Sequence, residues 1–292
     1  MCPAGRHEAW YRGKGLRGVG LAIVVSLAPG LVHGQWVEAP GKGWISVEAY
    51  HHDTRDRFDS NGDRNPIAVN GHAVSTAVFA TGAVGLIPNW DLWAPASLNF
   101  LSFDDAGRGR SENGPGDVNL WLRVAPLKYL GVDVPFALRG GVKLPAGAAP
   151  IDAEIIPLSE GQTDWEIMAE VGHSFWPRTV YVNGWLGYRY RLAHKETRRN
   201  PGNETFFLAQ VGGALGSVQY KLVVEGWDGG VPILEGIRVT TDQRNYLQVT
   251  PSLWYETGFG GFSSWDGACP SRVEIVPDGG ALVIGYFTRF GF

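Results

Sequence analysis

The stretch from Thr179 to Arg191, TVYVNGWLGYRYR, alternates between two kinds of side chain. Successive side chains of a β-strand point to opposite faces of a sheet, so this pattern predicts a strand whose two faces meet different environments. A half-buried strand of a soluble sheet has this pattern, and so does a strand of a membrane barrel whose aliphatic face meets lipid. The aliphatic face carries Val180, Val182, Leu186, Tyr188 and Tyr190, and the other face carries Tyr181, Asn183, Trp185, Arg189 and Arg191.

Repetition of strand-like segments favours the barrel. They are predicted at 44–52, 74–86, 92–103, 117–124, 136–144, 165–175, 179–191, 206–215, 218–227, 246–256 and 281–292, with at most a strand at 272–276 in an irregular region from 258 to 278. Long and short connections alternate, as in outer-membrane barrels, and 104–116 and 146–163 are predicted as long loops. We expect an all-β fold, a transmembrane antiparallel up-and-down β-barrel of about twelve strands, within about 10 to 14 and even in number.

The N-terminal residues 1–34 are predicted to be a secretory signal that is removed. Basic residues precede an apolar run, and cleavage after Gly34 would leave residues 35–292 as a single barrel domain. The uninterrupted core of the run, Val19 to Ala28, is shorter than the roughly 20 apolar residues that a membrane-spanning helix needs. Cys2 would leave with the signal, so Cys269, predicted to lie in a loop, would have no disulfide partner within the mature chain.

Charge and motifs exclude several classes of function. The net charge is −4 and no basic run is present, so we expect no nucleic-acid partner. The segment DSNGD, from Asp59 to Asp63, begins like a calcium loop but lacks Gly at the sixth position and Glu at the twelfth. It is predicted to be a solvated turn, and we expect no metal and no cofactor.

The last strand points to outer-membrane assembly. Its aliphatic and aromatic residues share one face, and the chain ends on an aromatic residue, which resembles the C-terminal signal that outer-membrane barrels present to their assembly machinery. We therefore expect the cell outer membrane as the location, with its lipid and the barrel-assembly machinery as partners. The residues assigned to the assembly signal are Tyr286, Phe290 and Phe292.

The opposite strand faces are predicted to line the lumen. They carry charges of both signs, which can form ion-pair ladders that narrow the bore, whereas a strongly selective ion pore would carry mainly one sign. A path for a small-molecule solute along these side chains is the other interpretation. The predicted lumen residues are Glu48, Asp117, Arg123, Arg139, Lys143, Glu166, Glu170, Arg189, Arg191, Lys221, Glu225, Glu256 and Arg289.

Four segments, GPGDVNLWLRV (114–124), ALRGGVKLPAG (137–147), EGQTDWEIMAEVGHSF (160–175) and VNGWLGYRYR (182–191), resemble strand motifs of a known family. It is the outer-membrane family named for the phenol meta-degradation pathway, which is related to the fatty-acid transporter barrels. The resemblance implies a passive channel or transporter for small compounds, including hydrophobic or aromatic ones, and it supplies no catalytic residues. Only Gln35 to Gly43 precede the first predicted strand, so no plug domain is expected.

Two alternatives to a channel remain open. One is a structural or adhesive barrel with a sealed lumen, which the sequence does not separate from a channel. The other is an outer-membrane lipid hydrolase, since some such barrels are lipases that use Ser and His. His173 and Ser174 are adjacent on a predicted strand and would point to opposite faces, so they cannot easily share a hydrogen bond. We therefore expect no enzyme.

Overall fold

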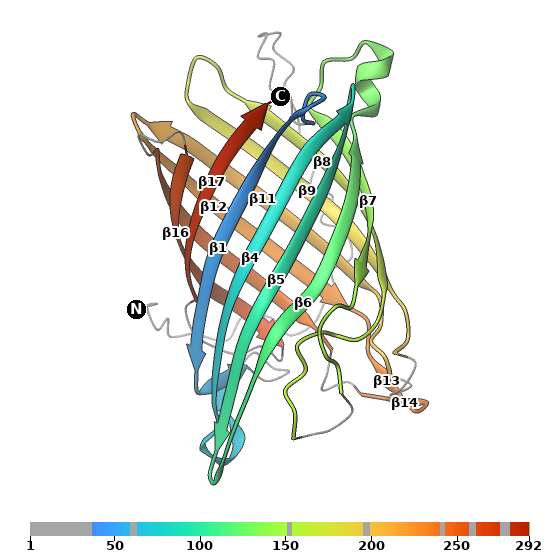
Figure 1. Cartoon of the computed structure of the whole chain (residues 1–292), viewed down its shortest axis with the longest axis vertical. Helices are drawn as coiled ribbons and strands as arrows, with labels where there is room; N and C mark the ends of the chain where they lie inside the picture. The colour runs from blue at the N-terminus through green and yellow to red at the C-terminus, as the bar shows by residue number, and fades with distance from the viewer. Residues whose placement is uncertain are drawn as a thin grey trace, which may run out of the picture.

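The computed structural model describes residues 37–58, 63–150, 154–194, 199–239, 243–256, 261–274 and 281–291, the backbone alone being described for 261–274. Twelve long strands of this part form a closed antiparallel barrel (Figure 1). Consecutive barrel strands pair with each other, and β1 pairs with β17 to close the wall. The predicted all-β barrel is therefore confirmed. Its strands are β1 (Lys42–Thr54), β4 (His72–Ile87), β5 (Trp90–Asp105), β6 (Arg108–Val124), β7 (Phe136–Leu144), β8 (Asp164–Ser174), β9 (Val180–Arg191), β11 (Glu204–Leu215), β12 (Val218–Gly229), β15 (Asn245–Glu256), β16 (Gly261–Glu274) and β17 (Ala281–Gly291).

The strands carry their aliphatic side chains on the outside of the barrel. Leu186 on β9 and Ile167 on β8 are each 60% exposed, whereas Glu166 and Glu170 on β8 are about 5% exposed or less. This inverts the arrangement of a soluble protein, in which apolar side chains are buried and charged ones meet water. An apolar outer surface with a polar interior is stable only where hydrocarbon surrounds the barrel.

The β5–β6 connection differs from the prediction. Residues 104–116 are not a long loop, because β5 and β6 continue outward and join through the two-residue turn Ala106–Gly107. Asp104 pairs with Gly109 in register, and Arg110 both bonds Asp105 and lies over the ring of Phe103 at 5.0 Å. Both faces of this extension are rich in polar residues because both meet water. The prediction of a loop from this polarity was wrong.

The region from 258 to 278 also differs from the prediction. Instead of an irregular segment with at most a short strand, residues Gly261–Glu274 form the strand β16, and Cys269 lies on this strand opposite Val249 rather than in a loop. A register shift in β15 between Leu247 and Gln248 lies where β16 pairs with it. Gly, Ser and Pro interrupt the alternation of β16 in the sequence, but backbone pairing with both neighbours defines the strand regardless of side-chain type.

The connections carry the smaller elements. The long β1–β4 connection holds the hairpin of β2 (Asp56–Phe58) and β3 (Arg64–Pro66), and a short helix η1 (Ala68–Asn70). At the same end, β10 (Arg199–Asn200), β13 (Ile233–Leu234) and β14 (Ile237–Arg238) form a small sheet (Figure 1). The opposite end has short turns and the helix η2 (Pro126–Leu130). In the described part of the chain, neither helix is long or apolar enough to cross a membrane.

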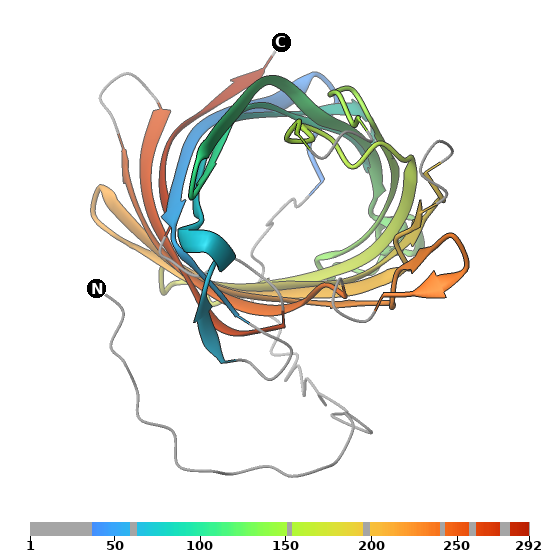
Figure 2. The same ribbon diagram turned by 90° about the horizontal axis from the view of Figure 1, so that it is seen from below.

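The chain that precedes β1 turns into the barrel mouth at the short-turn end. Val37 is 2% exposed and clusters with Ala125 and Ala137, and the backbone N–H of Glu38 donates to the carboxylate of Asp91 at 2.9 Å. The described residues 37–41 occupy part of this mouth. The view along the barrel in Figure 2 shows this segment passing inside the rim.

The β7–β8 connection also folds inward, at the opposite end. The N–H of Leu158 donates to the carbonyl of Ala148 at 2.9 Å, and the carbonyl of Leu158 accepts a bond from Asn99 on the wall. A Cβ at Gly147 would lie 2.1 Å from the carbonyl oxygen of Pro115, so only glycine permits this approach of loop to wall. The inward fold brings Ser159 and Glu160 among the side chains of the lumen.

Candidate functional site in the barrel interior

The first charged cluster is built around Glu170. Its carboxylate lies between two guanidinium groups, at 3.2 Å from Arg123 and bonded to Arg139. Arg123 also contacts the carboxylate of Asp91 at 2.6 Å. The four side chains come from the adjacent strands β5, β6, β7 and β8, and each is at most 5% exposed. Asp91 pairs in register with Arg123, and Arg123 with Arg139, so these side chains lie on the same side of the wall, where neighbouring strands set acid beside base.

Tryptophan rings surround this first cluster. The guanidinium of Arg139 lies 4.6 Å from the ring of Trp93, 5.1 Å from Trp121 and 5.5 Å from Trp185. Such cation–π contacts stabilise a cation that has been withdrawn from water. The N–H of Trp121 donates to Glu166 at 2.9 Å, which links the first cluster to a second one.

The second charged cluster follows along β8, β9 and β11. Arg189 contacts Glu166 at 2.5 Å and Glu204 at 3.0 Å, and Arg191 contacts Glu204 at 2.8 Å. The side chain of Glu204 is 1% exposed, and Arg189, Arg191 and a third cation, Arg244 at 3.2 Å, compensate its buried charge. The spacing of the arginines by two residues on β9 is the pattern that the sequence shows most clearly.

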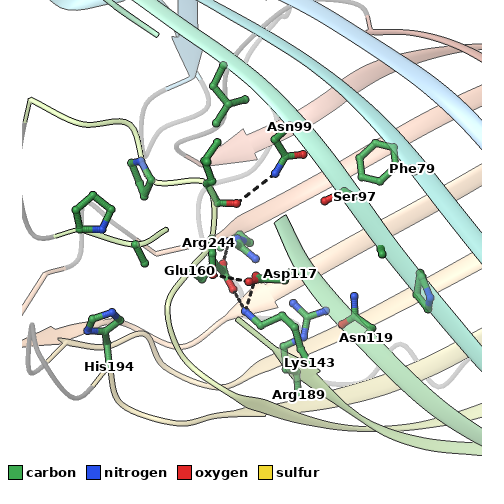
Figure 3. Close-up of a pocket in the computed structure, with 18 of the residues that line it drawn as sticks. Phe79, Ser97, Asn99, Asp117, Asn119, Lys143, Glu160, Arg189, His194 and Arg244 are labelled. Atoms are coloured by element: carbon green, nitrogen blue, oxygen red, sulfur yellow. Dashed lines mark hydrogen bonds and ion pairs between the residues drawn. The ribbon is translucent and has the colours of Figure 1, made fainter. Parts of the chain in front are cut away.

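The inward loop completes the second cluster. Lys143 contacts Asp164 at 2.7 Å and Asp117 at 3.3 Å, and it also bonds Glu160 of the loop. Glu160 in turn contacts Arg191 at 2.9 Å and Arg244 at 2.5 Å. Figure 3 shows Lys143, Glu160 and Arg244 converging on one point of the cavity wall. One loop carboxylate therefore joins three basic side chains from β7, β9 and the residue that precedes β15.

These contacts shift the pKa values of Glu160 and Arg244, which both lie in connections. Burial alone would raise the pKa of Glu160, but the nearby cations Arg244, Arg191 and Lys143 outweigh it and hold that pKa well below its usual range. Burial alone would lower the pKa of Arg244, but the carboxylates of Glu160 and Glu204 raise it above its ordinary value. Both groups therefore remain charged, and the loop is attached to the wall by charge-assisted bonds.

We expect the attachment to resist mild acid. The pKa of Glu160 is lower when folded, so its stabilising contribution is present above its ordinary pKa of 4.5 and is lost as the pH falls below that value toward the depressed one. Hydrogen exchange at the Leu158 amide, corrected for intrinsic rate, should show equal protection at pH 7 and pH 5 and a loss of protection only in stronger acid. Glu160→Gln should reduce protection at pH 7 and remove most of the acid dependence. Full protection of this variant at every pH would contradict the attachment.

Five charged residues of the two clusters were missed from the sequence. Asp164 has the same strand parity as Glu166 and was detectable by extending β8 by one residue, and Asp91 was assigned to a turn. Glu204 begins a strand that was predicted to start later. Glu160 and Arg244 lie in connections, where no periodicity indicates which way a side chain points. The five are Asp91, Glu160, Asp164, Glu204 and Arg244.

Four other predicted lumen residues lie apart from the clusters. Lys221 on β12 lies 5.0 Å from the ring of Trp254, and Glu225 follows on the same face of β12. The side chain of Arg289 is 70% exposed and lies 3.8 Å from Glu38. Glu48 lies on the same face of β1 as the buried Ser46. The side chain of Glu256, which was also predicted to line the lumen, is outside the described part of the structure.

Two further groups of predicted residues have defined positions. Tyr286 is 42% exposed on the outer face of β17, and Phe290 has the same strand parity, while Phe292 lies outside the described residues. Their role as an assembly signal stays a prediction. The ring of His173 packs edge-on against Phe175 at 4.7 Å, on the strand β8 that also carries Ser174. Asp59 and Asn61 of the predicted solvated turn lie outside the described residues, and no group of three or more possible metal ligands occurs among the residues that are described.

The clusters leave open volume in the lumen. They lie on the wall from β5 to β11, whereas β1 and β4 present the small inward side chains of Ser46 and its register partner Thr81 at one level and larger ones, such as Trp44 and Phe79, at others. A cavity of about 730 Å³ opens at the long-loop end (Figure 3), and a second cavity of about 330 Å³ lies at the short-turn end. The larger cavity is lined in part by Phe79, Ser97, Asn99, Asn119, Lys143 and Glu160.

The closed antiparallel wall, the apolar outside and the ion-paired inside define a membrane-spanning β-barrel of the outer-membrane type. A solved outer membrane channel from Pseudomonas putida F1 shares this fold, with a TM-score of 0.69 and 14% identity over 89% of this chain and 100% of that chain. The β domain of the Bordetella autotransporter BrkA matches less well, with a TM-score of 0.49 and 12% identity over 86% of this chain and 99% of that chain.

The fold and its apolar surface place the protein in the outer membrane, as predicted. No family model matches the sequence, and no curated protein matches it. The particular resemblance to the phenol-degradation family therefore stays a prediction, while the outer-membrane barrel class to which that family belongs is confirmed.

Proposed function

We propose that the protein is a passive outer-membrane channel for small solutes. The observation that carries the proposal is the arrangement of the lumen, in which the charged clusters occupy one side of the wall and leave cavities of about 730 Å³ and 330 Å³ toward the two mouths. The Pseudomonas barrel that shares the fold is itself described as an outer membrane channel, which supports this proposal.

The chemistry of the larger cavity favours small amphipathic compounds over simple ions. Its acids and bases neutralise one another in pairs, so the wall lacks the ring of like charges that selects ions by sign. Apolar side chains, including Phe79 and Leu158, alternate there with the neutral polar side chains Ser97 and Asn99. A solute with an apolar body and one or two polar groups finds contacts for both parts, and we propose no catalytic role for this lining.

Narrowing the larger cavity should reduce transport. Ser97→Trp would place an indole in the lumen and is expected to lower solute flux severalfold, because the added ring fills part of the path. Flux is measured by solute uptake into liposomes that carry the purified protein, comparing aromatic acids, hydrocarbons and sugars. Ala80→Trp is the matched control. Ala80 is exposed on the outer face of β4, whereas its chain neighbour Phe79 faces the lumen as the register partner of Ser97.

The control should retain the flux of the unsubstituted protein, because a tryptophan at an outer surface position meets lipid. Equal flux through both variants would argue against a path past Ser97. No flux of any solute through the unsubstituted protein would reject the channel and leave a structural barrel with a sealed lumen, which the segment of residues 37–41 in one mouth would help to close.

A further inference from the structure

The smaller cavity differs from the larger one, because its described lining holds basic side chains but no carboxylate. It lies at the short-turn end between β9, β11, β12, β15 and β17, and its lining combines two basic side chains with aromatic rings and side-chain amides. The residues that matter for its chemistry are Lys221, Arg289, Trp254, Phe287, Gln210 and Gln219.

The two cations of this cavity are poorly compensated. Each base of the charged clusters touches at least one carboxylate at hydrogen-bonding distance. Among the described carboxylates, Arg289 contacts Glu38, at the longer distance of 3.8 Å, and it lies 5.9 Å from the ring of Phe287, with 70% of its side chain exposed. Among the side chains that the structure describes, Lys221 has no acidic partner and lies against Trp254. The described lining of this cavity therefore offers positive charge to an anion, whereas the bases of the two charged clusters are already paired with carboxylates.

The rings form a continuous aromatic wall beside these cations. Trp254 lies 6.3 Å from Phe287, which lies 5.5 Å from Trp44, and Trp44 meets Trp93 edge-on at 4.8 Å. Ring centroids at these separations form edge-to-face and tilted pairs. Trp254 and Phe287 both line the cavity, so part of each ring is open to a ligand that enters it. On the other side, Gln210 donates to the hydroxyl of Tyr181 at 3.0 Å, which positions polar atoms around the cavity.

We propose that this cavity binds small aromatic carboxylates. The ring of the ligand would pack on Trp254 and Phe287, and its carboxylate would accept charge-assisted hydrogen bonds from Lys221 and Arg289. The inference rests on the proposed channel function and narrows it, because it names one class of solute and the place in the lumen where that class is retained. A neutral aromatic compound lacks the charge contacts, and a simple anion lacks the ring contacts.

The test measures the binding of benzoate to the purified, detergent-solubilised full-length mature protein by ligand-observed NMR titration. Benzamide carries the same ring without the charge, and acetate and inorganic phosphate carry charge without the ring. We expect benzoate to bind at least about tenfold more tightly than any of the three, which corresponds to about 1.4 kcal/mol. Lys221→Gln should weaken the binding of benzoate about tenfold and leave the affinity for benzamide unchanged. Arg289→Gln should also weaken the binding of benzoate.

Lys128→Gln is the matched control. It removes one positive charge at the same end of the barrel, but on η2, where Lys128 pairs with Asp133 outside the cavity. It should leave benzoate binding unchanged. Equal affinity for benzoate and benzamide, equal loss in the Lys221 and Lys128 variants, or tightest binding of phosphate would each overturn the proposal.

Liposome uptake separates this inference from the channel proposal. Benzoate binding that depends on Lys221, without flux of any solute, would retain the site and reject the channel. Flux that does not discriminate between benzoate and benzamide, with no Lys221-dependent binding, would retain the channel and reject the site.

Discussion

Replacement of Glu170 by alanine is expected to lower the free energy of unfolding by about 3 to 5 kcal/mol, because it leaves the buried guanidinium of Arg139 without its carboxylate partner. Glu170 is the carboxylate that Arg139 contacts, whereas Arg123 would keep its contact with Asp91. Both guanidinium groups are about 5% exposed, so water cannot readily replace the lost carboxylate. Urea unfolding of the protein reconstituted in lipid vesicles measures the change.

Two comparison variants give this prediction its specificity. Asp56→Ala breaks the ion pair with Arg64, whose side chain is 62% exposed, and should change the free energy of unfolding by only about 0 to 1 kcal/mol. The double variant Glu170→Ala/Arg139→Met removes the stranded cation and should recover part of the lost stability. A single variant as stable as the unsubstituted protein would mean that the first cluster does not brace the wall.

Replacement of Leu186 by arginine is expected to make folding into vesicles less favourable by about 2 to 4 kcal/mol if the residue lies near the bilayer midplane. Leu186 is 60% exposed on the outer face of β9, so the new charge would face hydrocarbon. Asn183→Arg on the same strand is the control, since Asn183 shares the inward parity of Trp185 and Arg189 and its register partner Gln210 lines the smaller cavity. It should be tolerated better.

The comparison of these two variants also tests the orientation of the strand. A larger loss for Asn183→Arg than for Leu186→Arg would mean that the lipid face and the lumen face are assigned the wrong way round. Measuring both in the same vesicles removes effects of lipid composition from the difference.

Strand periodicity carries most of what could be predicted from the sequence. Arg189 and Arg191 are two residues apart, and Arg139 and Lys143 are four residues apart. Such even spacing places both members of a pair on the same face of their strand, whatever the neighbouring strands are. Which acid meets which base depends on register, which the alternation does not specify. The pairing of Arg139 with Glu170 therefore became visible only in the structure.

Connections are the part that periodicity does not reach. Glu160 and Arg244 form a hydrogen bond although they are 84 residues apart in the chain. They meet because the β7–β8 connection folds inward and the β12–β15 connection places Arg244 at the same point. The extension of β5 and β6 was missed for another reason. Above a membrane a strand can have water on both sides, so its sequence loses the alternation on which strand prediction depends.

The β5–β6 hairpin has a consequence for the outside of the cell. Long loops of outer-membrane barrels are extracellular, so the turn at Ala106–Gly107 projects from the bacterial surface, at the lower tip of the barrel in Figure 1. A Cβ added at Gly107 would meet nothing within 4 Å, and the strands beneath it are paired up to Asp105 and Arg108. We expect a short peptide epitope inserted at this turn to be carried on a paired stem outside the membrane, where antibodies can bind it on intact cells.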